Sequence, residues 1–283
     1  MEQKFIDLFD RYTHGGMNRR DFLERLSLLA GSSAAATALL PALENNYARA
    51  EMVAENDPDI TAEMREIAPG IKGYLVRPKA PGKYPAVLVI HENRGLNPHI
   101  KDVTRRMAKE GFIAFGGDWL TSKGGTPEDA DRAREMFSAL KPEEALAYSK
   151  AAVDALAKID GGNGKVGAIG FCWGGGAVNA LAVSGDPNLK AGVSYYGMQP
   201  KAEDVPKIQA PLMLHYAELD ERINAGMKAY EEALKANGKE FEAFVYEGVN
   251  HAFNNDTNAA RYDKKAADLA WGRTVAFLKK NLG

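Results

Sequence analysis

The chain has 283 residues, which is enough for one globular domain of ordinary size and an appendage. Its formal net charge of −2 gives no basic field of the kind that nucleic-acid-binding proteins carry, so no nucleic-acid partner is expected. The single cysteine excludes an intramolecular disulfide and a cysteine-based metal cluster.

Residues 1–50 contain the parts of an export signal. A mildly apolar stretch from Leu26 to Leu40 follows a twin-arginine pattern, Asn18-Arg19-Arg20-Asp21-Phe22-Leu23. Ala48-Arg49-Ala50 then offers a small-residue cleavage site before Glu51. We therefore expect the twin-arginine export machinery as a partner, a periplasmic location, and a mature chain that begins near Glu51.

Two features of this segment leave a second interpretation open. Apolar side chains ahead of the arginines lie at helical spacing, which is typical of an amphipathic helix of the folded protein (Phe5, Leu8, Phe9 and Tyr12). The apolar stretch is poor in large residues, so no permanent membrane span is expected. An uncleaved segment would instead act as an anchor. Residues 51–70 form a polar leader to which the sequence assigns no function.

From residue 71 to residue 283 the chain alternates between apolar strand patterns and helical patterns. Strands are predicted at 73–77, 86–90, 112–115, 166–171, 191–196, 212–216 and 241–246. Helices are predicted at 100–110, 142–159, 174–183, 225–236 and 262–280. This alternation predicts an α/β domain with a mostly parallel sheet covered on both faces. Ligands bind such sheets beyond the carboxyl ends of the strands, where six polar or reactive residues fall: Glu92, Asp118, Cys172, Tyr196, Asp220 and His251.

The only cysteine lies between a predicted strand and a predicted helix, in Gly170-Phe171-Cys172-Trp173-Gly174-Gly175. A strand, a tight turn flanked by glycines and a helix make a nucleophile elbow, here with Cys in place of Ser. Side chains at the glycine positions would collide with so sharp a turn. The N-terminal dipole of the helix favours a thiolate at Cys172. A buried structural cysteine beside a glycine-rich turn is the alternative interpretation.

Two partners for Cys172 follow it in the chain order of α/β-hydrolases, which is nucleophile, acid and then histidine. Asp220 and His251 each come after a predicted strand. His251 can accept the thiol proton and later return it to the leaving group. Asp220 can hold the imidazole in one tautomer and stabilise its charged form.

Other residues compete for these two roles. Glu218 and Glu221 lie beside Asp220 and are alternative acids. The other histidines fit the role of the base less well. His14 lies in the export segment, and His99 begins a surface helix. His215 lies inside a strand, and His91 ends a strand as a structural residue.

The sequence resembles the dienelactone hydrolase (carboxymethylenebutenolidase) family, a cysteine-using branch of the α/β-hydrolases. The resemblance begins near Ile71 and rests on the elbow motif, Asp220, His91-Glu92-Asn93-Arg94-Gly95 and Gly248-Val249-Asn250-His251-Ala252-Phe253. It implies the α/β-hydrolase fold and a triad of Cys172, Asp220 and His251. It also implies that Glu92 hydrogen-bonds the resting thiol and takes its proton when substrate arrives. No cofactor and no metal are expected.

The oxyanion that forms on attack needs two preorganised N–H donors. We expect them to be the backbone N–H of Trp173, directly after the nucleophile, and that of Asn93. A thiol kept neutral by Glu92 would resist oxidation outside the cytoplasm. An ion pair with Arg94 is the alternative role for Glu92.

The chain departs from the family where the family binds its substrate. Family members hold a substrate carboxylate with arginines, one of them just after the catalytic histidine. Here Ala252-Phe253-Asn254-Asn255 follows His251, which argues against dienelactone itself. Arg94, Arg222 or Arg261 would have to substitute for the missing arginine. Aromatic residues near the strand ends favour an apolar pocket: Trp119, Trp173, Tyr196 and Phe253.

We therefore interpret the chain as an exported hydrolase of small carboxylic esters or lactones that forms an acyl-thioester on Cys172. A thioesterase or amidase is the alternative within the same class. A non-catalytic binding protein on a hydrolase scaffold is the alternative from another class, although a binding protein has no need of a complete triad. A thiol redox protein is disfavoured because the chain has no resolving cysteine.

Overall fold

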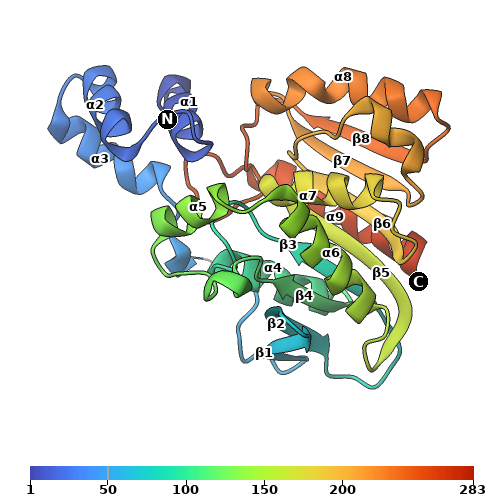
Figure 1. The fold of residues 1–283 in the computed structure, drawn as a ribbon. Helices are drawn as coiled ribbons and strands as arrows, with labels where there is room; N and C mark the ends of the chain where they lie inside the picture. The colour runs from blue at the N-terminus through green and yellow to red at the C-terminus, as the bar shows by residue number, and fades with distance from the viewer. Residues whose placement is uncertain (50) are drawn as a thin grey trace.

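The computed structural model describes residues 1–49 and 51–283, and Ala50 of the predicted cleavage site lies outside the described residues. Its centre is an eight-stranded sheet in the order β1-β2-β4-β3-β5-β6-β7-β8 (Figure 1). The strands are β1 (Ile60–Ala68), β2 (Ile71–Pro78), β3 (Tyr84–Ile90), β4 (Ile113–Gly117), β5 (Gly162–Phe171), β6 (Leu189–Tyr195), β7 (Leu212–Ala217) and β8 (Phe241–Tyr246). β2 is antiparallel to both its neighbours, and all the other pairs are parallel. This is the mostly parallel sheet that the sequence predicts.

Helices cover both faces of the sheet. One face carries α4 (Pro98–Lys109) and α9 (Lys264–Leu282); the other carries α6 (Pro142–Leu156), α7 (Trp173–Val183) and α8 (Glu221–Ala236). Successive side chains of a strand point to opposite faces, so β3 supplies two cores. Val87 and Val89 belong to the core under α4 and α9, whereas Leu88 and Ile90 belong to the core under the other three helices.

The predicted strands and helices of residues 71–283 are all present, with ends shifted by up to four residues. The sequence did not predict β1 or α5 (Ala130–Ser138). Short 3-10 helices lie at Tyr47–Arg49, Thr121–Lys123 and Ala202–Lys207. β1 falls within the predicted leader, where it pairs with β2 at the edge of the sheet. Only Ile60 of this strand is buried, so β1 lacks the alternation of apolar and polar residues by which a strand is recognised.

The N-terminal segment folds into α1 (Gln3–Thr13), α2 (Arg19–Ala30) and α3 (Ser33–Leu43), which lie together beside the sheet, next to α5 (Figure 1). The three helices share a small core in which the rings of Tyr12 and Phe22 stack 4.6 Å apart. α1 is therefore an amphipathic helix of the folded protein, as the second interpretation of this segment expects. Among the described helices, none alone is long and apolar enough to cross a membrane; α2 and α3 meet that test only as a pair bent by 112°.

Glycines at the junction of β5 and α7 allow the backbone to approach itself closely. A Cβ on Gly170 would lie 2.1 Å from the carbonyl oxygen of Gly174. A Cβ on Gly174 would lie 2.4 Å from the carbonyl oxygen of Ile90. In both cases the obstacle is backbone, which cannot move aside as a flexible side chain would.

We expect Gly170→Ala to lower the free energy of unfolding by about 1–3 kcal/mol or more, because the added methyl group overlaps backbone. Gly272→Ala is the matched control, since nothing lies within 4 Å of the Cβ position of this helical glycine. That substitution should instead stabilise the protein by about 0.5–1 kcal/mol. Thermal denaturation measures both effects, and equal melting temperatures for the two variants would contradict the steric argument.

Candidate active site

The turn between β5 and α7 holds Cys172 in a strained conformation. Its backbone has φ 55° and ψ −115°, and its N–H donates to the carbonyl oxygen of Tyr195 at 3.0 Å. The other non-glycine residues of the described chain with positive φ are Tyr196, at 38°, and Ala252, at 65°. Tyr196 and Ala252 both lie beside Cys172 in this structure. Such strain concentrates at functional sites, because the surrounding fold has to hold it in place.

Asp220 and His251 are joined by a short hydrogen bond. Asp220 lies at the N-terminus of α8, where its Oδ1 accepts from the backbone N–H of Ile223 at 3.3 Å. Its Oδ2 lies 2.5 Å from Nδ1 of His251. The helix cap fixes the carboxylate, and the carboxylate fixes the imidazole with a proton on Nδ1. Nε2 of His251 is buried without a hydrogen-bond partner among the described residues.

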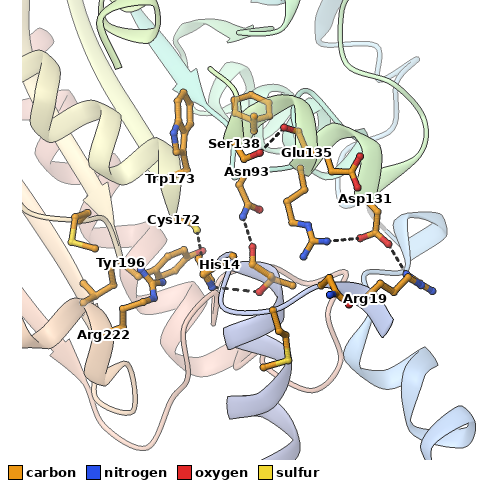
Figure 2. A pocket seen from close by; sticks show the side chains of 18 residues that line it. His14, Arg19, Asn93, Asp131, Glu135, Ser138, Cys172, Trp173, Tyr196 and Arg222 are labelled. Atoms are coloured by element: carbon orange, nitrogen blue, oxygen red, sulfur yellow. Dashed lines mark hydrogen bonds and ion pairs between the residues drawn. The ribbon is translucent and has the colours of Figure 1, made fainter. Parts of the chain in front are cut away.

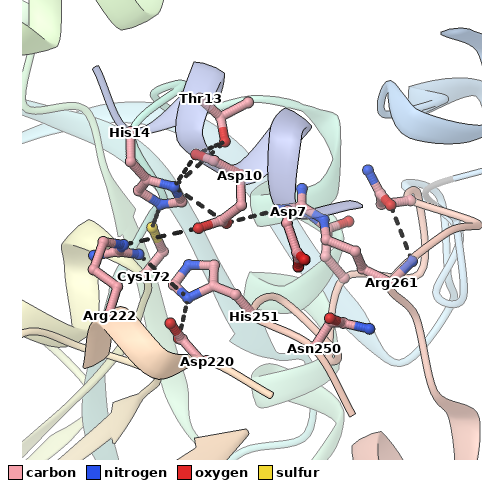
Figure 3. A network of polar contacts seen from close by, with 12 residues as sticks. Asp7, Asp10, Thr13, His14, Cys172, Asp220, Arg222, Asn250, His251 and Arg261 are labelled. Atoms are coloured by element: carbon pink, nitrogen blue, oxygen red, sulfur yellow. Dashed lines mark hydrogen bonds and ion pairs between the residues drawn. The ribbon is translucent and has the colours of Figure 1, made fainter. Parts of the chain in front are cut away.

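A second histidine also reaches the sulfur. His14 follows α1, and its Nε2 lies 3.2 Å from Sγ of Cys172 (Figure 3). The ring centroids of His14 and His251 are 4.8 Å apart and nearly perpendicular. The sequence excluded His14 from the site because it lies in the predicted export segment. The helical spacing of apolar residues in α1 was the available signal that this segment packs against the domain.

The two histidines govern the charge of the thiol. Burial alone would raise the pKa of Cys172, but His251 and His14 outweigh burial and lower it to about 6. Burial alone would lower the pKa of His251, but Asp220 and the Cys172 sulfur raise it to about 10. The pKa of His14 is likewise raised, against burial, by Cys172 and Asp10. The site therefore favours a thiolate at Cys172 beside a charged His251 at neutral pH.

Glu92 lies close to Cys172, but the thiol has a different partner. Both residues border a small cavity of about 20 Å³ together with His251. Oε2 of Glu92 accepts from Nδ2 of Asn255 at 2.8 Å, whereas the hydrogen bond to Sγ comes from His14. Glu92 and Arg94 form no ion pair among the described residues, and the guanidinium of Arg94 lies over the ring of Phe9 at 5.9 Å.

A cleft of about 720 Å³ opens beside Cys172 (Figure 2). The described residues that line it include both predicted oxyanion donors and two of the predicted pocket residues: Trp173, Asn93, Tyr196 and Arg222. The N-terminal segment forms another part of its wall, with Thr13, His14, Gly15, Met17, Asn18 and Arg19. The side chain of Asn93 donates to the carbonyl oxygen of Thr13 at 2.8 Å, so the loop after β3 is tied to that wall.

Trp119 and Phe253 lie in the core and do not line this cleft. Trp119 is 2% exposed, and its Nε1 donates to the carbonyl oxygen of Ala145 at 3.2 Å. Phe253 is fully buried, and its ring packs against Tyr196 at 5.5 Å. Both rings support residues of the site from behind. A position just after a strand end predicted proximity to the site but could not predict which way the ring points.

One group of described side chains has donor atoms close enough to hold a metal ion. These are His14, Cys172 and His251, whose ligand atoms lie within 4.8 Å of one another. Thiolate and imidazole are ligands that Zn²⁺ prefers. We assign the three groups to thiol chemistry instead, because the cysteine occupies a strand–turn–helix elbow and one of the imidazoles, that of His251, is already bound by Asp220.

Comparison with known proteins finds matches to two protein families. The dienelactone hydrolase family matches residues 71–282, and a second family, described as YqhI-like, matches residues 1–31. "Protein usf" of Aquifex pyrophilus is 36% identical over 75% of this chain and 94% of its own length. "Putative carboxymethylenebutenolidase" of Saccharolobus solfataricus is 32% identical over 74% of this chain and 94% of its own.

A solved structure gives the same architecture. The crystal structure of a "Putative Dienelactone Hydrolase" from Klebsiella pneumoniae superposes with a TM-score of 0.69 at 28% identity, covering 78% of this chain and 99% of that one. The fold is thus of the α/β-hydrolase type. With the family match spanning three quarters of the sequence, from the start of β2 to the end of α9, the chain belongs to the dienelactone hydrolase family.

Proposed function

We propose that the protein hydrolyses small carboxylic esters or lactones through a triad of Cys172, His251 and Asp220. The observation that carries this proposal is the 2.5 Å contact of Asp220 with His251, directly beside a cysteine held in a nucleophile elbow. A carboxylate, an imidazole and a thiol in this order form the proton-transfer chain that acyl transfer needs.

The first half of the reaction transfers the acyl group to sulfur. The Cys172 thiolate attacks the carbonyl carbon, and the N–H groups of Trp173 and Asn93 are the proposed donors to the oxyanion. His251 then donates its Nε2 proton to the leaving oxygen as the carbon–oxygen bond breaks. The product is an acyl-thioester on Cys172 and a free alcohol, or the ring-opened hydroxyl of a lactone.

Water completes the cycle. His251, now neutral, takes a proton from water as the water oxygen attacks the thioester carbonyl. The carbon–sulfur bond breaks, which releases the acid and restores the thiolate beside the imidazolium. Asp220 remains ionised throughout and stabilises the charged form of His251, whose pKa it raises.

The cleft supports a small and largely apolar substrate. Phe137, Trp173, Met198 and Ile223 contribute apolar surface, and Arg222 contributes a positive charge. The guanidinium of Arg222 lies 3.5 Å from Nδ1 of His251, and Arg222 lines the same cleft as Cys172. A relative named for carboxymethylenebutenolidase activity supports a lactone as the first substrate to test. Arg261 is less suited to bind substrate, because its guanidinium lies over the ring of Phe9 at 5.3 Å.

Cys172→Ala should abolish the hydrolysis of aryl esters and lactones, with a loss on the order of 10⁴-fold or more in kcat/KM. The substitution removes the nucleophile and adds no bulk, so the melting temperature should change little. Mass spectrometry after addition of an aryl ester should find the acyl adduct on Cys172 of the wild type only. Retention of about a tenth of the wild-type activity would rule out a cysteine nucleophile.

Asp220→Asn should lower kcat by about 10⁴-fold, because the amide cannot stabilise the imidazolium and favours the wrong tautomer. Glu221→Gln is the matched control, since this neighbouring carboxylate is exposed and the hydrogen bond to His251 comes from Asp220. Steady-state kinetics with one ester distinguishes the two variants. A larger loss of kcat in Glu221→Gln than in Asp220→Asn would show that Glu221 is the catalytic acid.

We also propose, from the arginine pair of residues 19 and 20, that the chain is exported by the twin-arginine route. The double substitution Arg19→Lys and Arg20→Lys should leave the protein in the cytoplasm, because the export machinery reads the arginine pair itself. Arg25→Lys, in the same helix but outside the pair, is the control. Cell fractionation with unchanged export of the double variant would refute this proposal.

A further inference from the structure

The hydrogen bond between His14 and Cys172 depends on how His14 is held from behind. Nδ1 of His14 lies 2.8 Å from the carbonyl oxygen of Asp10 and 3.2 Å from Oδ1 of its carboxylate (Figure 3). A carbonyl oxygen can only accept a hydrogen bond, so Nδ1 carries a proton. Nε2 of the neutral imidazole is then a lone pair that faces the sulfur.

Asp10 is itself held by the catalytic domain. Its carboxylate oxygens lie 3.6 Å from Nη1 of Arg261 and 3.8 Å from Nε of Arg222. Burial alone would raise the pKa of Asp10, but His14, His251 and Arg261 outweigh it and keep the carboxyl ionised. Cys172 therefore has a carboxylate-backed imidazole on each of two sides. Asp10 and His14 repeat, from the N-terminal segment, the arrangement of Asp220 and His251.

Several contacts fix the segment that carries His14. The hydroxyl of Tyr12 donates to Asp131 of α5 at 2.8 Å, and Nη1 of Arg134 donates to the carbonyl oxygen of Tyr12 at 2.6 Å. Arg19 forms an ion pair with Asp131 at 2.5 Å. Behind α1, the ring of Phe9 is 1% exposed and lies beneath two guanidinium groups of the catalytic domain. Because these contacts flank residue 14 on both sides, its position is set by a docked helix and not by a free tail.

We propose that His14 is a catalytic base of this hydrolase and that the N-terminal segment, residues 1–49, is a retained part of its active site. This inference deepens the proposed function and rests on it. The proton of the Cys172 thiol passes to Nε2 of His14 in the resting enzyme, which leaves a thiolate beside an imidazolium with both ring nitrogens protonated. His251, which is protonated on its own account because Asp220 raises its pKa, gives its Nε2 proton to the leaving group and takes one back from the attacking water.

If His14 accepts the thiol proton, Glu92 has no proton to take from the sulfur. Its carboxylate is engaged with Asn255, and His14 already occupies the hydrogen-bonding position at Sγ. The charged and titratable groups that face the Cys172–His14 pair come from four separate parts of the fold: Asp10, Glu92, Asp220, Arg222, His251 and Arg261. Of these, only His251 resembles His14 in carrying an imidazole nitrogen within 4.8 Å of the sulfur.

Retention of the segment also decides between two interpretations of the N-terminus. Cleavage before Glu51 would remove His14 and Asp10 together with one wall of the substrate cleft. An enzyme that uses His14 must keep the segment wherever it acts. An exported form would then carry its signal as part of the folded protein.

The test measures the pH dependence of Cys172 alkylation by iodoacetamide in the full-length chain. In the wild type the rate should rise with pH through a thiol pKa of about 6. His14→Gln keeps the size and polarity of the side chain but removes the base, so the apparent pKa should rise by about one unit or more. The kcat/KM for an aryl ester should fall by about 10²-fold. Arg25→Gln, an exposed position on α2, should match the wild type in both measurements.

Asp10→Asn provides a second variant that retains the imidazole. It removes the carboxylate behind Nδ1, so it should shift the thiol pKa in the same direction as His14→Gln but by less. The melting temperatures of both variants report whether the fold is intact. A merely structural role for His14 would lower the melting temperature and leave the alkylation profile of the folded protein unchanged, and that result would overturn the inference.

Other outcomes separate this inference from the proposed function. If His14→Gln shifts the thiol pKa while no ester or lactone is turned over by the wild type, His14 still controls the thiol but the hydrolase proposal fails. If Cys172→Ala is inactive and His14→Gln is as active as the wild type, the hydrolase stands and the role of His14 is refuted. A His14→Gln variant with higher activity than the wild type would show that His14 blocks access to Cys172, and that result also refutes its role as a base.

The N-terminus of the active protein gives an independent check. Intact-mass measurement of enzyme purified from its native compartment should find the segment that carries residue 14. A fully active protein that begins at residue 51 would overturn the inference whatever the alkylation results.

Discussion

The sharp turn from β5 into α7 is the constraint on which the site depends. Four glycines make it possible, because a Cβ at any of these positions would meet backbone at less than 3 Å: Gly170, Gly174, Gly175 and Gly197. The turn brings the end of β6 against the start of α7 and places Tyr196 in its own positive-φ conformation. The fold thus holds Cys172 at the carboxyl end of the central strand β5, in a geometry that an unconstrained chain would leave.

A buried thiolate has to be stabilised by nearby positive charge, and the structure supplies that charge as two imidazoles. Each imidazole is fixed by a carboxylate, one at the N-terminus of α8 and the other on α1. Cys172 is the N-cap residue of α7, so the helix dipole also stabilises a negative charge on its sulfur. Together these groups replace the water that burial removes, which is why the pKa of the thiol falls despite burial.

The sequence predicted the catalytic domain well because its signals are local. Apolar strands, helical periodicity and the glycine-flanked cysteine are all recognised within short windows of sequence, and the proposed triad rests on chain order. The edge strand β1 was missed because only Ile60 of it is buried. Trp119 and Phe253 were assigned to the pocket because residue position predicts the region of a side chain but not its direction.

His14 was missed for a different physical reason. It meets Cys172 across 158 positions of sequence, through the docking of a helical unit whose twin arginines favoured an export signal. A single stretch of sequence can have the pattern of an export signal and also that of a helix docked on the folded protein. Both consist of an apolar helix flanked by basic residues. In this chain Arg19 and Arg20 are the first residues of α2, so the same pair also begins a helix of the folded protein.

The peptide link between α3 and β1 makes the docking of His14 an intramolecular event. A tethered segment faces its binding site at an effective concentration on the order of millimolar, without any need for tight intrinsic affinity. If the chain is nicked in this stretch, the segment is held by its contacts alone. A nicked enzyme would then lose its second base on dilution and regain it on concentration. Its specific activity would depend on protein concentration, whereas that of the continuous chain would not.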